Sequence, residues 1–400
     1  MKYCFKGILY IILVMTICSC KKPYNPPAIA ASASYLVVAG VINAGPDSTI
    51  INLSRTVNLS SKVTVNPELN ATVVIQSDQN AVYPLYETSN GNYVAAGLNL
   101  DNAHNYRLSI RTSNNGQYYS DYVPVLNSPP IDSLYFTATS TGVNIYSATH
   151  DPSNKIKYYR WDYQETWIIH PPFDSGFISN GDTVLIRTPA QQVYKCWQTE
   201  TSSTIVLGSS AKLARDVIVD NPVTALPGLS PKIANEYSII VRQYALTADA
   251  YSFWINLKKN TEQLGSIFDA QPSQISGNIH SATNPSEPVI GYVSIGSTAS
   301  QRIFITTQQL PAYGPPNEDY PPNCEAVSYL YNYYAPGSTI PVNQVDEYIN
   351  YDKGGSTAPL IPIAPIAQPG GPILGFTAAP AICVDCTLRG TNIQPAYWKY

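Results

Sequence analysis

The sequence predicts a mainly β protein with two tandem β-sandwich domains, one amphipathic helix and a C-terminal segment rich in Pro and Tyr. Short runs of β-branched and aromatic residues recur along the 400 residues, with turn-forming residues between them. The chain contains 31 Tyr, which favours strands, and 33 Pro, which interrupts them. Only one stretch, 248–264, repeats apolar residues at helical spacing.

Residues 1–19 resemble the signal peptide of a bacterial lipoprotein. Two lysines precede an apolar run of eleven residues, which is shorter than the roughly 20 residues that a spanning helix needs. Small Ser19 precedes Cys20, so Cys20 is the predicted lipidation site, and a plain secretory leader is the alternative. The next residue is Lys21 and not Asp, which by resemblance to lipoprotein sorting rules favours the outer membrane. Surface-exported lipoproteins resemble one another in acidic residues just after the lipidated cysteine, but here no acidic residue precedes Asp47. The leaflet, periplasmic or surface, is therefore left undetermined.

A Pro- and Ala-rich tether is predicted at 20–34, and a first β-sandwich at 35–126. Turns at Asn90-Gly91 and Asn115-Gly116 indicate hairpins, because both central residues accept positive φ. The short strands and their spacing fit one small sandwich. The stiff segment 127–130 is the predicted domain boundary.

A second β-sandwich is predicted at 131–310. Trp161 lies in an aromatic run that is typical of the central strand of a fibronectin- or immunoglobulin-like sandwich. The β-branched run 237–246 and the strand expected at 289–295 are assigned to the same domain.

The helix predicted at 248–264 lies between these last two strands. Thr247 provides an N-cap hydroxyl, and Asp249 places a negative charge in the first turn. We expect Trp254, with Leu257 and Leu264, to anchor a buried stripe. The alternative is that this stripe is an exposed recognition face. Two lysines, Lys258 and Lys259, are expected on the solvent side.

The last predicted unit, 311–400, is a Pro/Tyr-rich segment that contains a C-x-x-C motif. Its stretch 354–380 is of low complexity and has little to bury. Tyr329, Tyr331 and Tyr333 alternate, so on a strand they would share one face and could stack on a sugar or anchor a partner. Ordinary sheet packing is the alternative.

Besides Cys20, four cysteines follow the leader, namely Cys196, Cys324, Cys383 and Cys386. In an exported chain we expect them to form two disulfides, with Cys196–Cys324 and Cys383–Cys386 slightly preferred among the three connectivities. Redox chemistry at the C-x-x-C motif would need a helix at the first cysteine, and zinc would need a second ligand pair.

No motif in the sequence names a reaction, a metal or a cofactor. Ser209-x-x-Lys212 matches the acyl-enzyme motif S-x-x-K, but the S-D-N and K-T-G elements that accompany it are absent. The four histidines stand apart and form no metal-binding motif. We therefore predict no catalytic residues, no metal site and no cofactor. The net charge of −4 argues against a nucleic-acid partner, which requires a basic face.

Several segments resemble the family called domain of unknown function 4249. They are 35–43 (YLVVAGVIN), 237–246 (YSIIVRQYAL), 284–292 (NPSEPVIGY) and the tail 383–398. Within the first domain, the runs from Ala71, Gly91 and Tyr106 also resemble prealbumin-like repeats. The resemblance implies an envelope lipoprotein of the Bacteroidota, often encoded beside a TonB-dependent outer-membrane transporter, and it implies no activity.

These observations favour a non-catalytic, lipid-anchored accessory or binding protein of the outer membrane. It would work with a TonB-dependent transporter in nutrient uptake and would bind a glycan or peptide. The alternatives are a structural envelope lipoprotein without a ligand and a hydrolase whose site no motif reveals.

Overall fold

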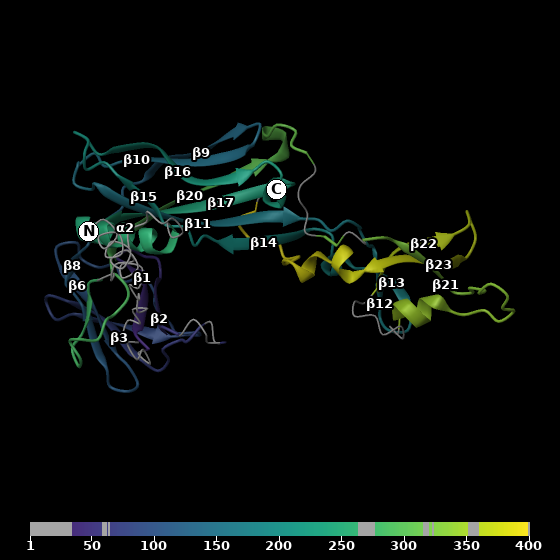
Figure 1. Ribbon diagram of the computed structural model, residues 1–400, viewed down its shortest axis with the longest axis horizontal. Helices are drawn as coiled ribbons and strands as arrows, with labels where there is room; N and C mark the ends of the chain where they lie inside the picture. Colours follow the sequence, from purple (N-terminus) through teal and green to yellow (C-terminus); the bar gives the residue numbers. More distant parts are fainter. Residues whose placement is uncertain are drawn as a thin grey trace, which may run out of the picture.

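The computed structural model describes residues 34–57, 62, 65–262, 277–314, 320–321, 324–350 and 360–398. It is mainly β and has one α-helix among these residues, which confirms the predicted fold class. Figure 1 shows two packed β bodies and, extending from them along the long axis, a narrow unit that we call the arm.

The first body is a sheet in which buried and exposed residues alternate along each strand. In β2 (Thr49–Arg55), Ile51 and Leu53 are buried whereas Ile50 is exposed. This period of two turns one face of every strand into a common apolar core. The other strands from this part of the chain are β1 (Leu36–Asn43), β3 (Thr72–Ser77), β4 (Val82–Glu87), β5 (Asn92–Ala95), β6 (Asn105–Arg111), β7 (Gln117–Ser120) and β8 (Val123–Pro124).

The segment 277–296 belongs to this first body, so its expected place in the second sandwich is wrong. Its strands β18 (Ile279–Ser281) and β19 (Ile295–Gly296) pair with β7 and β1, giving the order β18-β7-β6-β3-β4-β5-β2-β1-β19. Gly291 has φ +141° and passes so close to the Val38 carbonyl that a Cβ would lie 2.1 Å from its oxygen. β18 and β19 thereby cover the two edges of this sheet. The periodicity of so short a segment does not reveal which sheet it joins.

The second body is a sandwich of a three-stranded and a five-stranded sheet. Trp161 is fully buried between the two sheets, and its indole Nε1 donates to the Gln243 side chain at 3.0 Å. Its strand, β11, pairs with β17 on one side and with β14 and β15 on the other, as predicted for a Trp-bearing central strand. The small sheet contains β9 (Ile131–Thr139), β10 (Gly142–His150) and β16 (Val217–Pro227); the large one contains β11 (Tyr158–Ile169), β14 (Cys196–Thr201), β15 (Val206–Ser209), β17 (Glu236–Leu246) and β20 (Thr298–Thr306).

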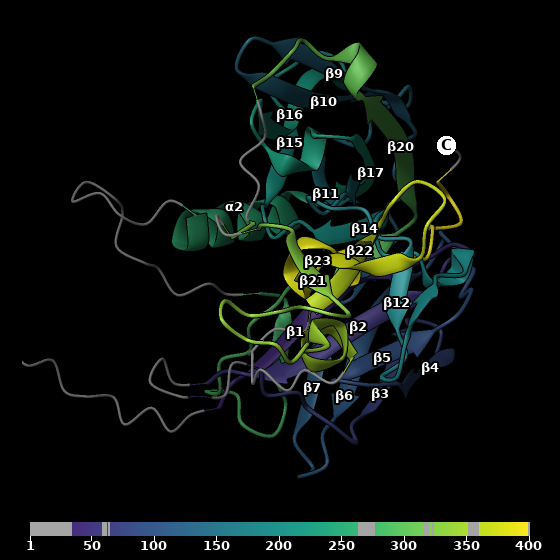
Figure 2. The same ribbon diagram turned by 90° about the vertical axis from the view of Figure 1, so that its right-hand side faces the viewer.

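The single α-helix, α2 (Ala248–Glu262), begins where the sequence predicts. The Thr247 hydroxyl accepts a hydrogen bond from the Ala250 amide at 3.1 Å, which confirms the N-cap, and Asp249 lies in the first turn. Leu264 lies outside the described residues. The helix lies between the two bodies when the molecule is viewed along its length (Figure 2).

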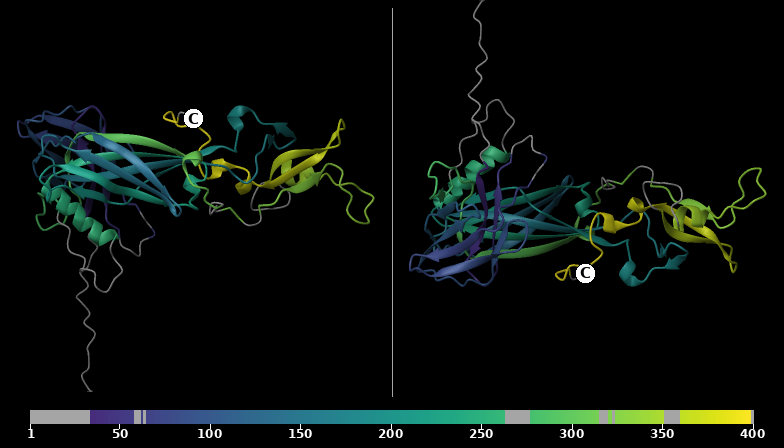
Figure 3. Two further views of the ribbon diagram at one scale, coloured as in Figure 1. Left: turned by 90° about the horizontal axis from the view of Figure 1, so that it is seen from above. Right: turned by 90° about the horizontal axis from the view of Figure 1, so that it is seen from below.

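The arm combines two segments that are far apart in the sequence. It is made of β12 (Phe177–Ser179), β13 (Val184–Ile186), β21 (Val327–Leu330), β22 (Leu360–Ala367), β23 (Ile373–Pro380) and the π-helix η4 (Val345–Asn350). Figure 3 shows it projecting from the two bodies. The described part of the low-complexity stretch, 360–380, forms the β22–β23 hairpin. Phe376 and Ala378 are buried in a small core, so the expectation that this stretch has little to bury is wrong.

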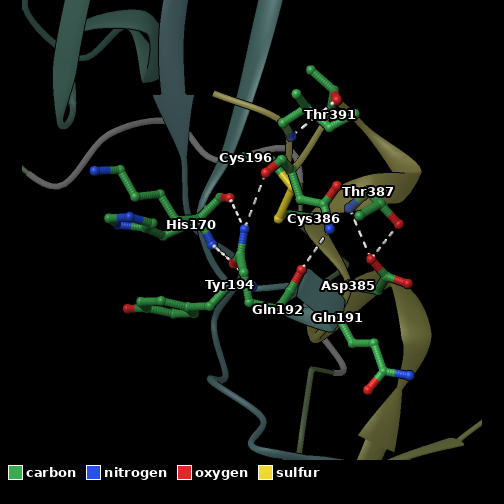
Figure 4. Close-up of a disulfide and its surroundings, with 12 residues drawn as sticks. His170, Gln191, Gln192, Tyr194, Cys196, Asp385, Cys386, Thr387 and Thr391 are labelled. Atoms are coloured by element: carbon green, nitrogen blue, oxygen red, sulfur yellow. Dashed lines mark hydrogen bonds between the residues drawn. A yellow bond between two sulfur atoms is a disulfide. The ribbon is translucent and has the colours of Figure 1, made fainter. Parts of the chain in front are cut away.

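Two disulfides join the arm to the second body and to itself, but with a different connectivity from the preferred one. Cys196 pairs with Cys386, and Cys324 pairs with Cys383, with Cα–Cα distances of 5.7 and 5.6 Å. Figure 4 shows the first of these next to His170 and Tyr194. Cys383 and Cys386 do not pair with each other, because they lie in separate 3₁₀ turns that contact different neighbours. The 3₁₀ helices are η1 (Pro189–Gln191), η2 (Pro231–Ile233), η3 (Thr307–Gln309), η5 (Ala381–Cys383) and η6 (Cys386–Leu388).

The end of the chain returns to the second body after the arm. Thr391 exchanges backbone hydrogen bonds with Trp197, and the Tyr397 hydroxyl hydrogen-bonds with the Thr166 hydroxyl at 2.8 Å. Trp398 is buried against Trp197 and Phe304. The described residues of 311–400 are therefore divided among three places. Tyr313 packs against the small sheet of the second body, the middle part forms the arm, and residues 391–398 form a strap across the five-stranded sheet.

Candidate functional site

A cleft of about 780 Å³ lies where the first body, the five-stranded sheet and α2 meet. We call it the interbody cleft. Its floor is the outward face of the sheet: Tyr159 and Trp161 on β11 point into the sandwich, so Arg160 and Asp162 point out. Arg242 and Tyr244 on the neighbouring β17 lie beside them on the same face.

One wall of the cleft is the outward face of β1, and it is unusually apolar. Val37, Ala39 and Val41 alternate with core residues and line the cleft together with the exposed Ile50. A sheet face that meets only solvent normally carries polar residues at such positions. The aliphatic surface thus indicates that this face is meant to be covered.

The opposite wall comes from α2, which contributes Phe253, Trp254 and Leu257. The buried residues of the helix are Ala250 and Phe253, whereas Trp254 is only half-buried. The expectation that Trp254 anchors a buried stripe is therefore wrong, because the helix turns its neighbour Phe253 inward. The exposed recognition face considered as the alternative fits this orientation.

Arg160 is stacked between two aromatic rings at the floor of the cleft. Its guanidinium carbon lies 4.5 Å from the centre of the Tyr244 ring and 4.3 Å from that of Trp254. No hydrogen bond leaves this guanidinium within the described part of the chain, and its Nε is buried without a partner. The nearest carboxylate is Asp162, at 3.7 Å from the guanidinium Nη2.

Asp162 is shared by two arginines, because Arg242 also approaches it, at 3.4 Å. The floor therefore carries more positive than negative charge. Burial raises the pKa of Tyr244, and the charge of Asp162 raises it further. Burial likewise raises the pKa of Tyr292 at the rim. Both phenols therefore stay protonated at neutral pH.

The lining of the cleft offers several kinds of group that can contact a ligand. Its lining contains hydrogen-bond donors, aromatic faces and aliphatic side chains, and its acids are Asp162 and Asp47. No histidine or cysteine lines it, so the usual pairs of nucleophile and base are missing from the lining. Within the described residues, no group of three His, Cys, Asp or Glu side chains could hold a metal ion.

The tyrosines selected from the sequence lie in the arm, away from the cleft. Tyr329 packs at 5.6 Å from the Tyr348 ring, and Tyr331 at 6.4 Å from that of Phe376, so both contribute to the arm core. Strand β21 ends at Leu330, and Tyr333 follows it in a bridge to Val342. Packing in the arm core is thus the structural role of the first two.

The other selected residues lie elsewhere. Cys20 is outside the described residues, and the four later cysteines are all in disulfides. Among the described residues, no helix is long and apolar enough to cross a membrane.

Sequence reasoning missed Arg160 and Arg242, although two signals were available. Residues 36–43 form an apolar run without alternation, which is typical of a strand covered on both faces. Arg160 and Asp162 interrupt a row of aromatic residues at a period of two, which places both charges on one outward face. The sequence did not reveal that the outward face of β1 and the outward face of β11 oppose each other across the cleft.

The chain was compared with known families and structures once this geometry was established. A family model described as "Domain of unknown function (DUF4249)" matches residues 21–302. The resemblance seen in the tail 383–398 lies beyond that range. No curated protein matches the chain.

Among solved structures, the adhesin InvE of Yersinia pseudotuberculosis shows 12% identity and a TM-score of 0.14. The alignment covers 53% of this chain and 55% of that one, so the chain spans about half the length of that structure. A TM-score this low does not establish a shared fold.

Proposed function

This chain belongs to the family of domain of unknown function 4249, and we propose that it is a non-catalytic binding protein whose ligand occupies the interbody cleft. The observation that carries the proposal is the Arg160 guanidinium, which is stacked between Trp254 and Tyr244 and has no hydrogen-bond acceptor among the described residues. An arginine held this way at the base of an apolar cleft is suited to receive a ligand.

The volume and composition of the cleft support the same proposal. Small-molecule sites typically occupy about 300–1,000 Å³ and combine apolar walls with a few polar groups. The 780 Å³ cleft, with the aliphatic face of β1 opposite α2, has both properties.

A thermal-shift screen tests this function on the mature protein. The panel would contain neutral and acidic oligosaccharides, short peptides, amino acids, and alkyl acids and alcohols. A ligand that binds only the folded state raises the melting temperature. We expect at least one compound to raise the melting temperature of the wild type and to leave that of Ala39→Trp unchanged, because the new indole fills the cleft.

The matched control is Val219→Trp, which adds the same side chain at a site 69% exposed on β16, outside the cleft. This variant should respond like the wild type. A panel without any response, or responses that persist in Ala39→Trp, would contradict a ligand site here and favour a structural envelope protein.

We further propose that lipid on Cys20 holds the protein on the outer membrane of a Bacteroidota cell. The support is the apolar leader and the small residue before Cys20. Metabolic labelling with a clickable fatty acid should mark the wild type and leave Cys20→Ala unlabelled. Equal labelling of the two proteins would place the lipid elsewhere.

The same proposal makes the protein an accessory of a TonB-dependent transporter in nutrient uptake, with the arm as the contact surface. The arm carries no charged residue between Glu325 and Asp346 or in 360–384. Several of its apolar side chains are exposed, among them Ile340 at 72% and Ile373 at 48%. An uncharged apolar surface is suited to a stable protein contact.

Co-purification tests this partner. A TonB-dependent transporter identified by mass spectrometry should accompany the wild type and be lost from the double variant Ile340→Asp/Ile373→Asp. Val219→Asp on the second body is the control and should retain it. Equal recovery with the double variant would exclude the arm as the contact.

A further inference from the structure

We propose that the ligand of the interbody cleft is a hydrophobic molecule that carries a single carboxylate. The inference rests on the proposed binding function and names the chemical class that the cleft selects. The carboxylate would bind the Arg160 guanidinium at the floor, and the apolar body would lie between β1 and α2.

The charged end is indicated by the unused hydrogen-bonding capacity of Arg160. A guanidinium has five N–H donors in a fixed plane. The Nε of Arg160 is buried without a partner among the described residues, and the nearest carboxylate, Asp162, lies 3.7 Å from its Nη2, beyond hydrogen-bond distance. The side chain is 15% exposed, and two rings at 4.3 and 4.5 Å hold its plane in place. A carboxylate matches such a fork with two parallel hydrogen bonds.

The charge balance favours an anion with one negative charge. Arg160 and Arg242 face the single carboxylate of Asp162, at 3.7 and 3.4 Å. Asp47 also lines the cleft, but it is an exposed rim residue and comes within 4.0 Å of neither arginine. A monoanion neutralises the excess positive charge, whereas a dianionic phosphate would place extra negative charge beside Asp162.

The apolar end is indicated by the two walls. Val37, Ala39 and Val41 present a row of aliphatic groups on one side, and Ile50 continues it at 52% exposure. Leu257 lies on the opposite wall. A ligand that covers these groups removes apolar surface from water, which is the main driving force for binding such a body. A sugar or a short polar peptide would leave this gain unused.

The test compares three ten-carbon probes by isothermal titration calorimetry with the full mature protein. Decanoate carries the carboxylate, decanol is its neutral counterpart, and decyl phosphate carries the dianion. We expect decanoate to bind at least about tenfold more tightly than either of the others. Tighter binding of decyl phosphate would overturn the carboxylate, and equal binding of decanol would overturn the anion.

Substitutions of the arginines at the floor of the cleft test whether the preference for decanoate depends on Arg160. Arg160→Gln should weaken decanoate at least about tenfold and leave decanol unchanged. Arg160→Lys keeps the charge but not the fork, so it should retain part of the preference. Arg215→Gln, at an exposed arginine outside the cleft, is the control and should bind like the wild type. Thermal melts of each variant establish that it is folded, and Arg242→Gln gives a second reading if Arg160→Gln does not fold.

The outcomes separate this inference from the function on which it rests. Failure of decanoate to bind the wild type, or equal binding by Arg160→Gln, overturns the carboxylate ligand. If a neutral compound from the thermal-shift panel nevertheless depends on an open cleft, the binding function stands without it.

Discussion

The two ends of the five-stranded sheet present similar outward-facing side chains, but they are covered in different ways. At one end the C-terminal strap lies on the sheet, with Tyr397 stacked 3.7 Å from the Arg302 guanidinium. At the other end Arg160 is stacked on Tyr244 and Trp254, and the space above it is the interbody cleft. The same arginine–aromatic contact thus closes one end and leaves the other end accessible.

The two ends of the sheet differ in whether the chain supplies hydrogen-bond partners for the polar groups of these side chains. Arg302 also donates to the Ser238 hydroxyl at 2.9 Å, and Trp398 donates to Glu236 at 3.1 Å, so the chain itself supplies the partners. Arg160 has no such acceptor among the described residues. Buried polar groups normally have hydrogen-bond partners, so the comparison supports our proposal that a ligand supplies the partner of Arg160.

The largest expected effect is a difference in the free energy of unfolding between variants at the two ends of the five-stranded sheet. Trp398→Ala removes an indole that is 3% exposed, and we expect a loss of about 3–5 kcal/mol in the free energy of unfolding. Trp254→Ala, at the half-buried position in the cleft, should cost about 1–2 kcal/mol. Urea unfolding of the two variants measures both. A larger loss for Trp254→Ala would mean that the cleft is part of the core and not a binding site.

The second prediction concerns how the strap is held in place. The Cys196–Cys386 disulfide closes a sequence separation of 190 residues. Cys196→Ser/Cys386→Ser should therefore lower stability by about 2–5 kcal/mol and make the strap more susceptible to proteolysis, while binding in the cleft is retained. Non-reducing peptide mapping checks the connectivity directly. A Cys383–Cys386 linkage in the wild type would refute the connectivity seen here.

The smallest expected effects come from the two lysines of α2, both expected from sequence on the solvent side. Lys258 donates to the Ile205 carbonyl at 2.6 Å and pairs with Glu262 at 3.7 Å. Lys258→Ala should therefore cost about 1 kcal/mol, because it loosens the contact that holds the cleft wall to β15. Lys259 is exposed, and Lys259→Ala should change stability by less than about 0.5 kcal/mol. Equal melting temperatures of the two variants would show that the Lys258 contact does not hold the helix.

The sequence predicted those features that depend on neighbouring residues. The N-cap at Thr247 and the strand character of 237–246 are local, and both are confirmed. The fully buried Trp161 on a central strand follows from a local aromatic pattern. The orientation of α2 was not predicted, because Phe253 and Trp254 are adjacent and only the packing surface decides which of them is buried.

The partners of distant segments were decided by the tertiary structure. The number of cysteines and the expectation of an exported chain were enough to predict two disulfides, but the partner of Cys383 depends on where the arm folds back. In the same way 277–296 completes the edges of the first sheet, although its sequence equally suits the second.

The chain by itself therefore determined local elements such as the strand 237–246, the start of its single described α-helix and its disulfide-forming cysteines, because propensity and periodicity act over a few residues. The tertiary structure alone decided that the apolar face of β1 opposes Arg160 and Trp254. Arg160 follows the end of β1 by 117 residues and Trp254 follows Arg160 by 94 residues. These elements come together only when three packed surfaces meet around one arginine.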